Sequence, residues 1–423
     1  MQKKVRCLIC GAVFDADLTT CPVCGVGPEH FVPVEDKPMA FRRDTDERFL
    51  ILGGGGAALS AAEAIRERNA TATIVMLTDE ATPPYHRPLL TKEFGAPYAR
   101  LAVHPDSWYQ QNHILALTDR QVQALEPAAR EVVLEGGFRM KYDRCIYALG
   151  ASSFIPPMAG TDLPEVCVLR ALRDADQIAA LIAAGKKSAV VIGGGVLGLE
   201  AAWALREKGC AVTVLERGER LMPRQLDEET SQMLLNAAAK AGVQVRCNAS
   251  SEAIVGDGGH VAGVRLVGGE TLPADLVLIS SGVRANIGVA QAAGLATGRG
   301  VRVNARMETS QVGVYACGDC AETDPPSAQL WPAAAEMGRI AGANAAGDNL
   351  TYEPASAAVT FHGMGTALYS DGAIGAGDRV VREKDEAKQT LQTCYYEGEK
   401  LRGVILFGDI SRAGDFQRQM QEI

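Results

Sequence analysis

The sequence predicts an α/β fold with two parallel sheets, because one strand–glycine–helix–strand pattern occurs twice. The first copy, RFLILGGGGAALSAAEAIRERNATATIVMLTDE, spans residues 48–80, and the second, SAVVIGGGVLGLEAAWALREKGCAVTVLERGE, spans residues 188–219. In each copy an apolar run precedes the glycines, as is typical of a strand buried on both faces of a parallel sheet. A third observation, four cysteines in two C-x-x-C pairs near the start, predicts a separate small metal-binding unit.

Length and composition limit the class of protein. The chain has 423 residues, 47% of them apolar and 22% charged, which indicates a folded chain of several domains. The net charge of −9 argues against nucleic acid or an anionic membrane as the main partner. The longest apolar stretch, residues 189–199, is too short for a membrane span, and the start lacks the apolar segment of a secretory signal. We therefore expect a soluble cytoplasmic protein.

Changes in composition along the chain predict its domain organisation. The charged segment near residue 40 has no hydrophobic period and is predicted to be a linker, whose extended length of roughly 35 Å would let the small unit move relative to the rest. The predicted segments are a metal knuckle domain (1–36), the linker (37–46), a first dinucleotide-binding domain (47–152 and 273–350), a second one (153–272) and a small α+β C-terminal domain (351–423).

The second glycine cluster fits the dinucleotide-binding pattern G-x-G-x-x-G. Gly193 allows the tight turn, Gly195 lets a pyrophosphate approach the backbone, and Gly198 lets helix and strand pack closely. Glu216 ends the next predicted strand, where a carboxylate accepts hydrogen bonds from a ribose diol and repels a 2′-phosphate. The pattern favours NADH over NADPH, although two arginines follow Glu216 closely.

The first glycine cluster reads Gly53, Gly55 and Ala58, with alanine as an allowed variant at the third place. Asp79 or Glu80 would then hold the ribose. A single cluster of this kind also fits a glycine-rich turn that binds no ligand. Two copies, each followed by a helix, a strand and an acid, favour two nucleotide sites.

Around these clusters the chain resembles a known family, the FAD/NAD(P)-binding pyridine nucleotide-disulfide oxidoreductases, with the closest likeness to NADH:rubredoxin oxidoreductases and the reductase halves of nitrite reductases. The likeness covers roughly residues 48–410. Ala148-Leu149-Gly150 departs slightly from the family's A-T-G, and Ala285 replaces a usual proline. Its further motifs are PPYHRPLLTKEF (83–94), YALGA (147–151), SSGVRAN (280–286), VYACGDCAE (314–322) and LWPAAAEMGRIAGANAAG (330–347).

The resemblance implies two Rossmann-like domains, with FAD on the first copy and NADH on the second. It also implies that Lys92 lies near the flavin ring and pairs with Glu200, and that these two residues are catalytic. An exposed basic pair at 87 and 92, and simple core packing of the tryptophan at 331, are the competing interpretations. The other residues that the resemblance places at the cofactors are Arg87, Gly150, Gly282, Gly318, Asp319 and Trp331.

Relatives that reduce disulfides or peroxide carry a redox cysteine soon after the first glycine cluster. This chain has no cysteine between Gly56 and Tyr142. A flavin here would therefore have no thiol relay and would pass electrons directly to an acceptor. The C-x-x-C of Cys317 and Cys320 lies inside the FAD motif, and we do not expect it to be redox active.

Cys7, Cys10, Cys21 and Cys24 form two knuckles that are predicted to bind one metal ion. Four thiolates suit either zinc or iron, so the ligands alone leave the metal open. The stretch CPVCGVGPEHFVPVE (21–35) resembles the second knuckle of rubredoxins. Fusion to a domain that resembles rubredoxin reductases favours iron, and a zinc ribbon stays as the alternative.

Together these features predict a flavoenzyme that moves electrons from NADH through FAD to a fused Fe(Cys)4 centre. From there the electrons would pass to an external protein such as rubredoxin, rubrerythrin or another diiron or redox partner. One alternative is an NADH oxidase or peroxidase that acts directly at the flavin. Another is an electron-input subunit that docks onto a larger redox complex through a zinc ribbon. A homodimer and a subunit of a complex are both compatible with the sequence.

Overall fold

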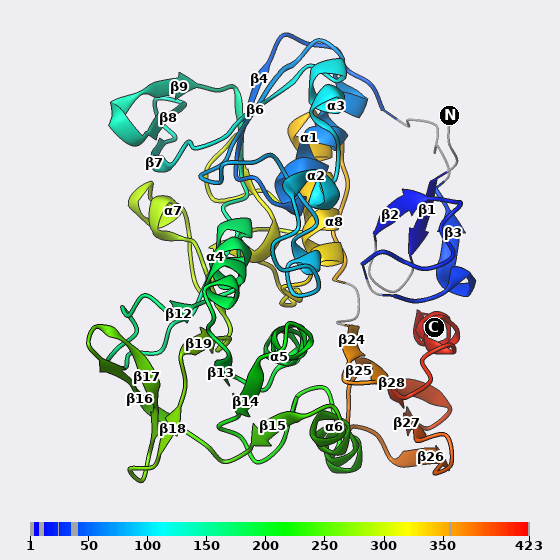
Figure 1. Ribbon diagram of the computed structural model, residues 1–423. Coiled ribbons are helices and arrows are strands. Elements are labelled where there is room, and N and C mark those ends of the chain that lie inside the picture. Colours follow the sequence, from blue (N-terminus) through cyan, green and yellow to red (C-terminus); the bar gives the residue numbers. More distant parts are fainter. Residues whose placement is uncertain (1–3, 8–11, 24, 35–40, 355–357, 422–423) are drawn as a thin grey trace.

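A computed structural model describes residues 4–7, 12–23, 25–34, 41–354 and 358–421. Within these residues the chain forms a small cysteine unit (the described part of 4–34), two Rossmann units and a C-terminal unit that begins at residue 358 (Figure 1). Both Rossmann units are built on parallel five-stranded sheets, which confirms the predicted α/β class.

The first Rossmann unit has the strand order β22-β10-β4-β5-β6, with all neighbours parallel. Chain order reverses between β4 and β10, and open α/β sheets bind ligands at such a reversal. Helices α1 (Gly56–Arg68) and α8 (Trp331–Ala345) pack closely against each other on this sheet. The strands are β4 (Arg48–Leu52), β5 (Thr73–Leu77), β6 (Ile114–Leu117), β10 (Arg144–Tyr147) and β22 (Val314–Ala316).

Shorter elements surround this sheet. A three-stranded antiparallel meander, β7-β8-β9, covers one side of it, and a loop with a short 3-10 helix leads toward the second unit. The bounds are β7 (Val122–Glu126), β8 (Glu131–Leu134), β9 (Arg139–Lys141), η2 (Arg87–Leu89), α2 (Tyr98–Leu101), α3 (Asp106–Gln111) and α7 (Gly288–Ala292).

The second Rossmann unit repeats this plan with the parallel order β12-β19-β13-β14-β15 and a meander β16-β17-β18. Its chain order reverses between β13 and β19. The bounds are β12 (Val166–Cys167), β13 (Ser188–Ile192), β14 (Ala211–Leu215), β15 (Val243–Arg246), β16 (Ser251–Asp257), β17 (His260–Leu266), β18 (Thr271–Pro273) and β19 (Leu276–Ile279), with helices α4 (Leu172–Ala183), α5 (Val196–Glu207) and α6 (Glu228–Lys240).

Two strands connect the Rossmann units. β11 (Ala151–Ser153) leaves the first unit and pairs antiparallel with β20 (Val283–Ala285), which returns to it. The sequence predicts the return after residue 272, but β19 pairs with β13 in the second sheet. The chain therefore returns to the first unit only after the end of β19, because this buried apolar strand completes the second sheet.

The C-terminal unit is an antiparallel sheet of order β24-β25-β28-β27-β26 followed by helix α9 (Ala413–Gln421). Asp227 fixes it to the second Rossmann unit, because its carboxylate caps α6 at Thr230 N and accepts hydrogen bonds from Arg382 and the Tyr395 hydroxyl. The strands are β24 (Val359–Gly363), β25 (Thr366–Gly372), β26 (Arg379–Asp385), β27 (Thr390–Glu397) and β28 (Lys400–Phe407).

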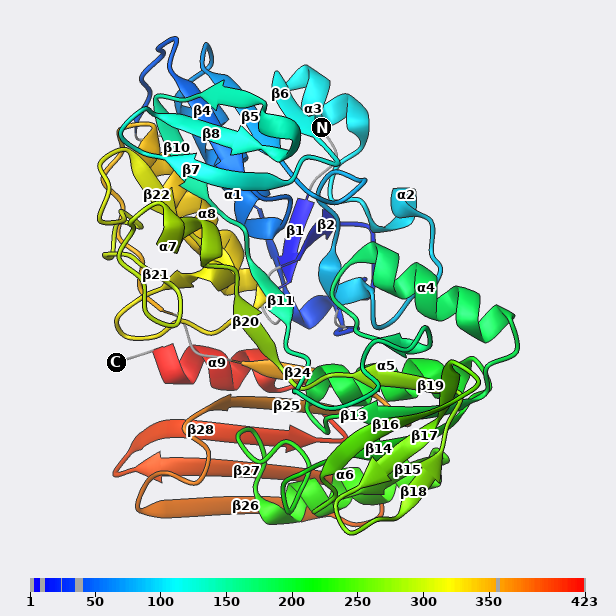
Figure 2. The same cartoon turned by 90° about the vertical axis from the view of Figure 1, so that its left-hand side faces the viewer.

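The cysteine unit is a three-stranded antiparallel sheet of order β2-β1-β3. Its strands are β1 (Lys4–Cys7), β2 (Val13–Asp15) and β3 (Phe31–Pro33). The rings of Phe14 and Phe31 meet edge to face at 4.8 Å and form a small core. In Figures 1 and 2 this unit lies between the first Rossmann unit and α9. Its likeness to rubredoxin stays a prediction.

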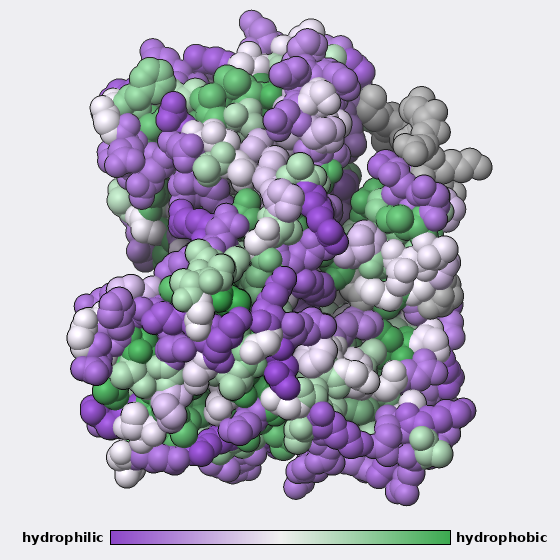
Figure 3. All heavy atoms as spheres, viewed as in Figure 1, coloured by the Kyte–Doolittle hydropathy of each residue, from purple (hydrophilic) through white to green (hydrophobic). Residues whose placement is uncertain are grey.

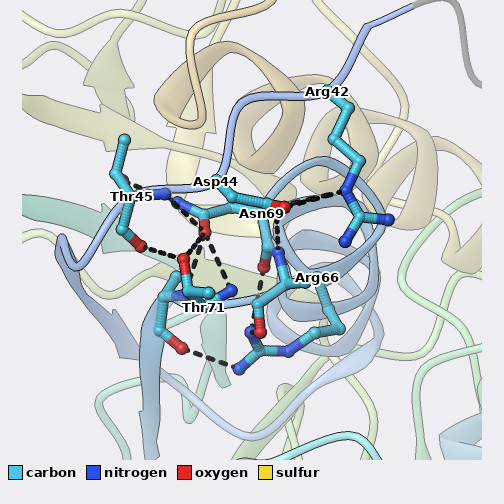
Figure 4. Close-up of polar contacts among 8 residues, drawn as sticks. Arg42, Asp44, Thr45, Arg66, Asn69 and Thr71 are labelled. Carbon is cyan, nitrogen blue, oxygen red and sulfur yellow. Dashed lines mark hydrogen bonds and ion pairs between the residues drawn. The ribbon is translucent and has the colours of Figure 1, made fainter.

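The end of the predicted linker is attached to the first Rossmann unit (Figure 4). Asp44 accepts a hydrogen bond from Ala70 N at 2.7 Å, and Asn69 Nδ2 donates to Thr45 Oγ1 at 2.7 Å. Thr71 Oγ1 donates to the carbonyl oxygen of Thr45 at 2.7 Å. These bonds hold the chain against the C-terminal end of α1. The linker residues 37–40 lie outside the described residues.

The surface seen in Figure 3 is mostly hydrophilic and is notched at one edge between the first Rossmann unit above and the second below. Across the described ranges, no helix is long and apolar enough to cross a membrane.

Candidate active site

Both Rossmann units end their first strand in the same strained turn. Gly53 has φ +134° and Gly193 has φ +122°, a backbone region that residues with a side chain rarely adopt. A Cβ atom would lie 2.1 Å from the Ala148 carbonyl oxygen in the first case and 2.2 Å from the Ser280 carbonyl oxygen in the second. Each turn therefore packs directly on the neighbouring strand, at the point where its sheet reverses chain order.

The helices that follow these turns begin in open space. Gly55 caps α1 and Gly195 caps α5, and neither helix start has a side-chain cap in the described structure. A Cβ atom at either residue would meet no atom within 4 Å. The first N–H groups of each helix are therefore open to a phosphate. At the third place of the pattern, a Cβ atom on Gly198 would lie 2.0 Å from the Gly193 carbonyl oxygen, whereas the first unit accommodates a fully buried Ala58.

The acid after the second strand is held by its own turn in the second unit. Glu216 accepts hydrogen bonds from Gly194 N at 2.8 Å and Gly218 N at 2.6 Å. In the first unit, Thr78 lies at the corresponding position, because it directly follows β5. Its Oγ1 atom would lie 2.4 Å from a Cβ atom built on Gly54. Sequence reasoning missed Thr78, because the acid pattern draws attention to the two residues after it.

Of those two acids, Asp79 is exposed, whereas Glu80 is partly buried and bonded to neighbouring side chains. Glu80 Oε1 pairs with Arg87 Nη2 at 2.6 Å, and the Tyr85 hydroxyl donates to Glu80 Oε2 at 2.6 Å. Burial raises the pKa of Glu80, but the Arg87 guanidinium and the Tyr85 hydroxyl outweigh it and hold this pKa below its usual value. Arg87 also donates to the carbonyl oxygen of Arg170, so Glu80 positions Arg87 at the boundary between the units.

Asp319 lies beside the start of α1, because a Cβ atom on the preceding Gly318 would lie 2.8 Å from the Ala57 Cβ. Its carboxylate pairs with Arg170 Nη2 at 2.7 Å. The sequence gives no signal of this pair, since the two residues belong to different Rossmann units. Gly150 and Gly282 directly precede the two connecting strands.

Lys92 and Glu200 meet across the same boundary. Lys92 Nζ lies 3.1 Å from Glu200 Oε1, and the buried Thr91 hydroxyl donates to Glu200 Oε2 at 2.6 Å. Glu200 is buried in the second turn of α5, while the lysine side chain is partly exposed. The loop of residues 83–94 therefore holds a cation beside the start of the second nucleotide helix.

Trp331 is the first residue of α8 and packs against the start of α1. A Cβ atom on Gly56 would lie 2.9 Å from Trp331 Cζ2. The His86 ring lies near the tryptophan ring, with 5.8 Å between ring centroids and a 41° tilt. Trp331 thus connects the first glycine cluster to the loop of residues 83–94.

Two of the four predicted metal ligands, Cys7 and Cys21, make matching backbone hydrogen bonds. Cys7 N donates to the Ala12 carbonyl oxygen at 2.8 Å, and Cys21 N donates to the Val26 carbonyl oxygen at 2.8 Å, each five residues onward. Both cysteines are buried. Cys10 and Cys24 lie outside the described residues, and those that are described contain no group of three or more potential metal ligands.

The other C-x-x-C has no open thiol. Cys317 and Cys320 are fully buried, and burial raises the pKa of Cys320 to about 12 and the pKa of Cys317 well above its usual value. Both thiols therefore stay protonated at neutral pH. Because the thiolate is the reactive form of cysteine, neither thiol is expected to react.

Comparison with known proteins identifies the family. Residues 47–338 match the pyridine nucleotide-disulphide oxidoreductases, which is more than half of the chain. The chain belongs to this family. Membership confirms the predicted enzyme class, an oxidoreductase that uses FAD and a pyridine nucleotide.

Three members of the family illustrate the likeness. The chain is 29% identical to nitrite reductase (NAD(P)H) of Bacillus subtilis, a match that covers 89% of this chain and only 47% of that one. It is 32% identical to NADH oxidase of Methanocaldococcus jannaschii, with 73% and 72% covered. The crystal structure of NADH:rubredoxin oxidoreductase from Clostridium acetobutylicum superposes with a TM-score of 0.74 at 26% identity, covering 89% of this chain and 95% of that one.

Proposed function

We propose that the protein passes electrons from NADH through FAD to an iron held by Cys7, Cys10, Cys21 and Cys24, and from there to an external redox protein. The observation that carries this proposal is the position of the cysteine unit. Its buried side chains, Cys21 among them, belong to one continuous apolar cluster with Leu89 and Leu90 of the loop that also holds Lys92.

Bound FAD would supply the conversion between NADH, which donates two electrons as a hydride, and an acceptor that takes one electron at a time. The residues around the first glycine cluster fit this cofactor. The open start of α1 at Gly55 would bind its pyrophosphate, Asp79 and Thr78 would face its ribose, and Asp319 would hold its ribityl chain, with Trp331 beside the ring.

The second unit fits NADH for the same physical reasons. The open start of α5 at Gly195 would bind the pyrophosphate, and Glu216 would accept hydrogen bonds from the ribose hydroxyls while its charge repels a 2′-phosphate. The fixed position of this carboxylate supports the preference for NADH.

Lys92 and Glu200 are proposed to act at the flavin. The ammonium of Lys92 would stabilise negative charge on the reduced ring, and Glu200 would orient that ammonium through their 3.1 Å contact. Thr91 also holds Glu200 in place, because its hydroxyl donates a hydrogen bond to the second carboxylate oxygen of Glu200.

The four cysteines are proposed to bind a single metal ion. Cys7 and Cys21 make the same backbone hydrogen bond, from the cysteine N–H to the carbonyl oxygen five residues onward, which supports equivalent roles for these two cysteines. A unit of about 35 residues with so small a core gains most of its folding free energy from a bound metal. Iron rather than zinc is proposed because the unit packs against a reductase.

Anaerobic mixing with NADH tests the proposal directly. The protein is produced with iron, its metal content is measured, and NADH is added without oxygen. Both the flavin absorbance and the visible thiolate-to-iron bands should bleach. Bleaching of the flavin alone, with persistent iron bands, would remove iron from the electron path.

The 32% identical NADH oxidase supports a second candidate, direct reaction of the flavin with oxygen. A Cys10→Ser and Cys24→Ser double variant separates the two functions. The oxidase is favoured by two results together. The variant would keep its NADH turnover with oxygen, and the iron-loaded wild-type chain would turn over NADH no faster when a redox protein is added.

A further inference from the structure

One loop of the first Rossmann unit, residues 80–95, contacts two helices of the second unit. These helices, α4 and α5, lie along the side of the second unit that faces the first (Figures 1 and 2). At α5, the Thr91 hydroxyl donates to Glu200 Oε2 at 2.6 Å. At α4, a Cβ atom on Gly95 would lie 3.2 Å from the Ala179 Cβ. The loop therefore holds the two units together in addition to the paired strands β11 and β20.

Tyr85 makes the central contact between this loop and α4. Its hydroxyl accepts a hydrogen bond from Leu172 N at 2.8 Å and donates one to Glu80 Oε2 at 2.6 Å. A phenol hydroxyl has one proton to donate and lone pairs to accept with, so both bonds form at once. The Tyr85 side chain is 2% exposed, so water has little access to replace either partner. Tyr85 thus joins an acid of the first unit directly to the first residue of α4.

Arg87 makes a second contact with the same stretch of backbone. Its Nη2 pairs with Glu80 Oε1 at 2.6 Å, and its Nη1 donates to the carbonyl oxygen of Arg170. The carbonyl of residue 170 and the N–H of residue 172 are the groups that one extended chain presents to a neighbouring strand. Here two side chains, Tyr85 and Arg87, bind them instead, and one carboxylate, Glu80, holds both side chains in place.

The stretch that these side chains bind is itself fixed to α4. Asp174, in the first turn of the helix, accepts hydrogen bonds from Arg170 N and Ala171 N, both at 2.8 Å. The Arg170 side chain pairs with Asp319 of the first unit at 2.7 Å. A contact at Leu172 N therefore acts on the helix as a whole, because the residues before it cannot move independently of it.

The relative position of the two Rossmann units decides whether NADH and FAD can react. The first glycine cluster is proposed to bind FAD and the second NADH, so a hydride has to pass between groups that different units hold. NADH loses this hydride, two electrons with one proton, and becomes NAD⁺, while FAD gains it and becomes FADH⁻. Reacting atoms must approach to about 3–3.5 Å, and a displacement of about 1 Å can cost about 100-fold in rate. Contacts between the units therefore act on hydride transfer without touching either cofactor.

We propose that Tyr85 is a positioning residue for hydride transfer, whose hydroxyl holds the start of α4 against the first Rossmann unit and so fixes the distance between nicotinamide and flavin. The inference rests on the first step of the proposed function, reduction of FAD by NADH, and does not depend on the cysteine unit. Tyr85 lies outside both glycine clusters, and its two hydrogen bonds are to Glu80 and to the backbone of the second unit. Its effect on the reaction is therefore one of geometry.

Removal of the hydrogen bond from either side tests this role in the full-length, FAD-loaded protein. Tyr85→Phe deletes the acceptor, and Leu172→Pro deletes the N–H donor. Proline is tolerated at the first position of a helix, and Ala171 already has the extended backbone that is favoured before proline, with φ −116° and ψ 164°. In anaerobic stopped-flow mixing, both variants should lower the rate of flavin reduction at saturating NADH about 10- to 100-fold. The dissociation constant for NADH should stay nearly unchanged, because the second glycine cluster is intact.

Matched variants separate the hydrogen bond from the loss of a side chain. Tyr109→Phe removes another buried tyrosine hydroxyl of the first unit, which has no hydrogen-bond partner within the described part of the chain, and should leave the rate unchanged. Leu172→Ala shortens the side chain but keeps the N–H, and should slow flavin reduction far less than Leu172→Pro. Hydrogen exchange of the oxidised protein gives a readout without turnover, and Tyr85→Phe, unlike Tyr109→Phe, should increase exchange in residues 170–175.

The double variant completes the test. Tyr85→Phe combined with Leu172→Pro should be no slower than the slower single variant, because both changes remove the same bond. Wild-type rates of flavin reduction in both single variants, effects that multiply in the double variant, or a loss confined to NADH binding would each overturn the positioning role. Failure of the proposed function looks different, because it appears in the wild-type protein, whose iron bands would persist after NADH is added.

Discussion

Glu216 has both carboxylate oxygens bound by the backbone of its own turn, through Gly194 N and Gly218 N. Charge-assisted hydrogen bonds of this kind fix the position of a carboxylate before any ligand arrives. A ribose diol would find acceptors already in place, and a 2′-phosphate would find a fixed negative charge. We therefore expect selectivity for NADH to depend on this side chain.

Glu216→Gln tests this role at the residue scale. Removal of the charge should lower the ratio of kcat/KM for NADH to that for NADPH by about tenfold or more, since a hydrogen bond to a charged group contributes about 1.5–3 kcal/mol. The change should appear mainly in KM. Glu219→Gln, at an exposed position of the same loop, is the control and should leave the ratio unchanged. An equal effect of both variants would assign the preference to general charge.

Single residues also show what the sequence can and cannot predict. The turns at Gly53 and Gly193 follow from local geometry, because only glycine fits their positive φ angles beside a neighbouring strand. Thr78 was missed because its place depends on the residue at which β5 ends. The exposure of Asp79 and the pairing of Glu80 with Arg87 depend on the fold of the next loop, which carries no local signal.

At the scale of elements, Glu165 connects edge strand β12 to the meander of the second Rossmann unit. Its side chain is buried and accepts hydrogen bonds from Val261 N at 2.9 Å and from His260 Nδ1 at 2.7 Å, with Lys186 at 3.1 Å. Burial raises the pKa of Glu165, but the Val261, His260 and Lys186 contacts outweigh it and lower this pKa to about 2. The ionised carboxylate therefore stabilises the fold.

The sign of the pH dependence follows from that lowered value. A group whose folded-state pKa lies below its unfolded value stabilises the protein above the unfolded pKa, near 4.5, and loses the contribution as the pH falls toward 2. We expect Glu165→Gln to lower the free energy of unfolding by about 3 kcal/mol at pH 7. Urea unfolding should show the difference shrinking as the pH falls below 4.5, and a difference independent of pH would contradict this assignment.

Sequence patterns do not predict side-chain pairs between elements that are far apart in the chain. Arg170 and Asp319 meet because two Rossmann units are packed together, and no spacing in the chain predicts their 2.7 Å contact. Similarly, the linker was expected to be free up to residue 46, but Asp44 and Thr45 bond to the end of α1. Hydrophobic periodicity identifies elements, whereas these contacts depend on how the elements pack.

At the scale of the whole molecule, the two Rossmann units, the C-terminal sheet and the cysteine unit form one connected body (Figure 1). Their repeated strand patterns could be predicted because they are local. The docked position of the cysteine unit could not, since it arises from contacts such as His30 with Gly414 between opposite ends of the chain.

Anaerobic titration with NADH measures the number of electrons that the protein accepts. If FAD and the iron are both on the path, the iron-loaded chain should take up about three electrons, or about one and a half NADH, and the Cys10→Ser and Cys24→Ser double variant about one NADH. The flavin and iron bands should bleach together in the first case. Uptake of about one NADH by the iron-loaded chain, with its iron bands unchanged, would contradict electron transfer to the cysteine unit.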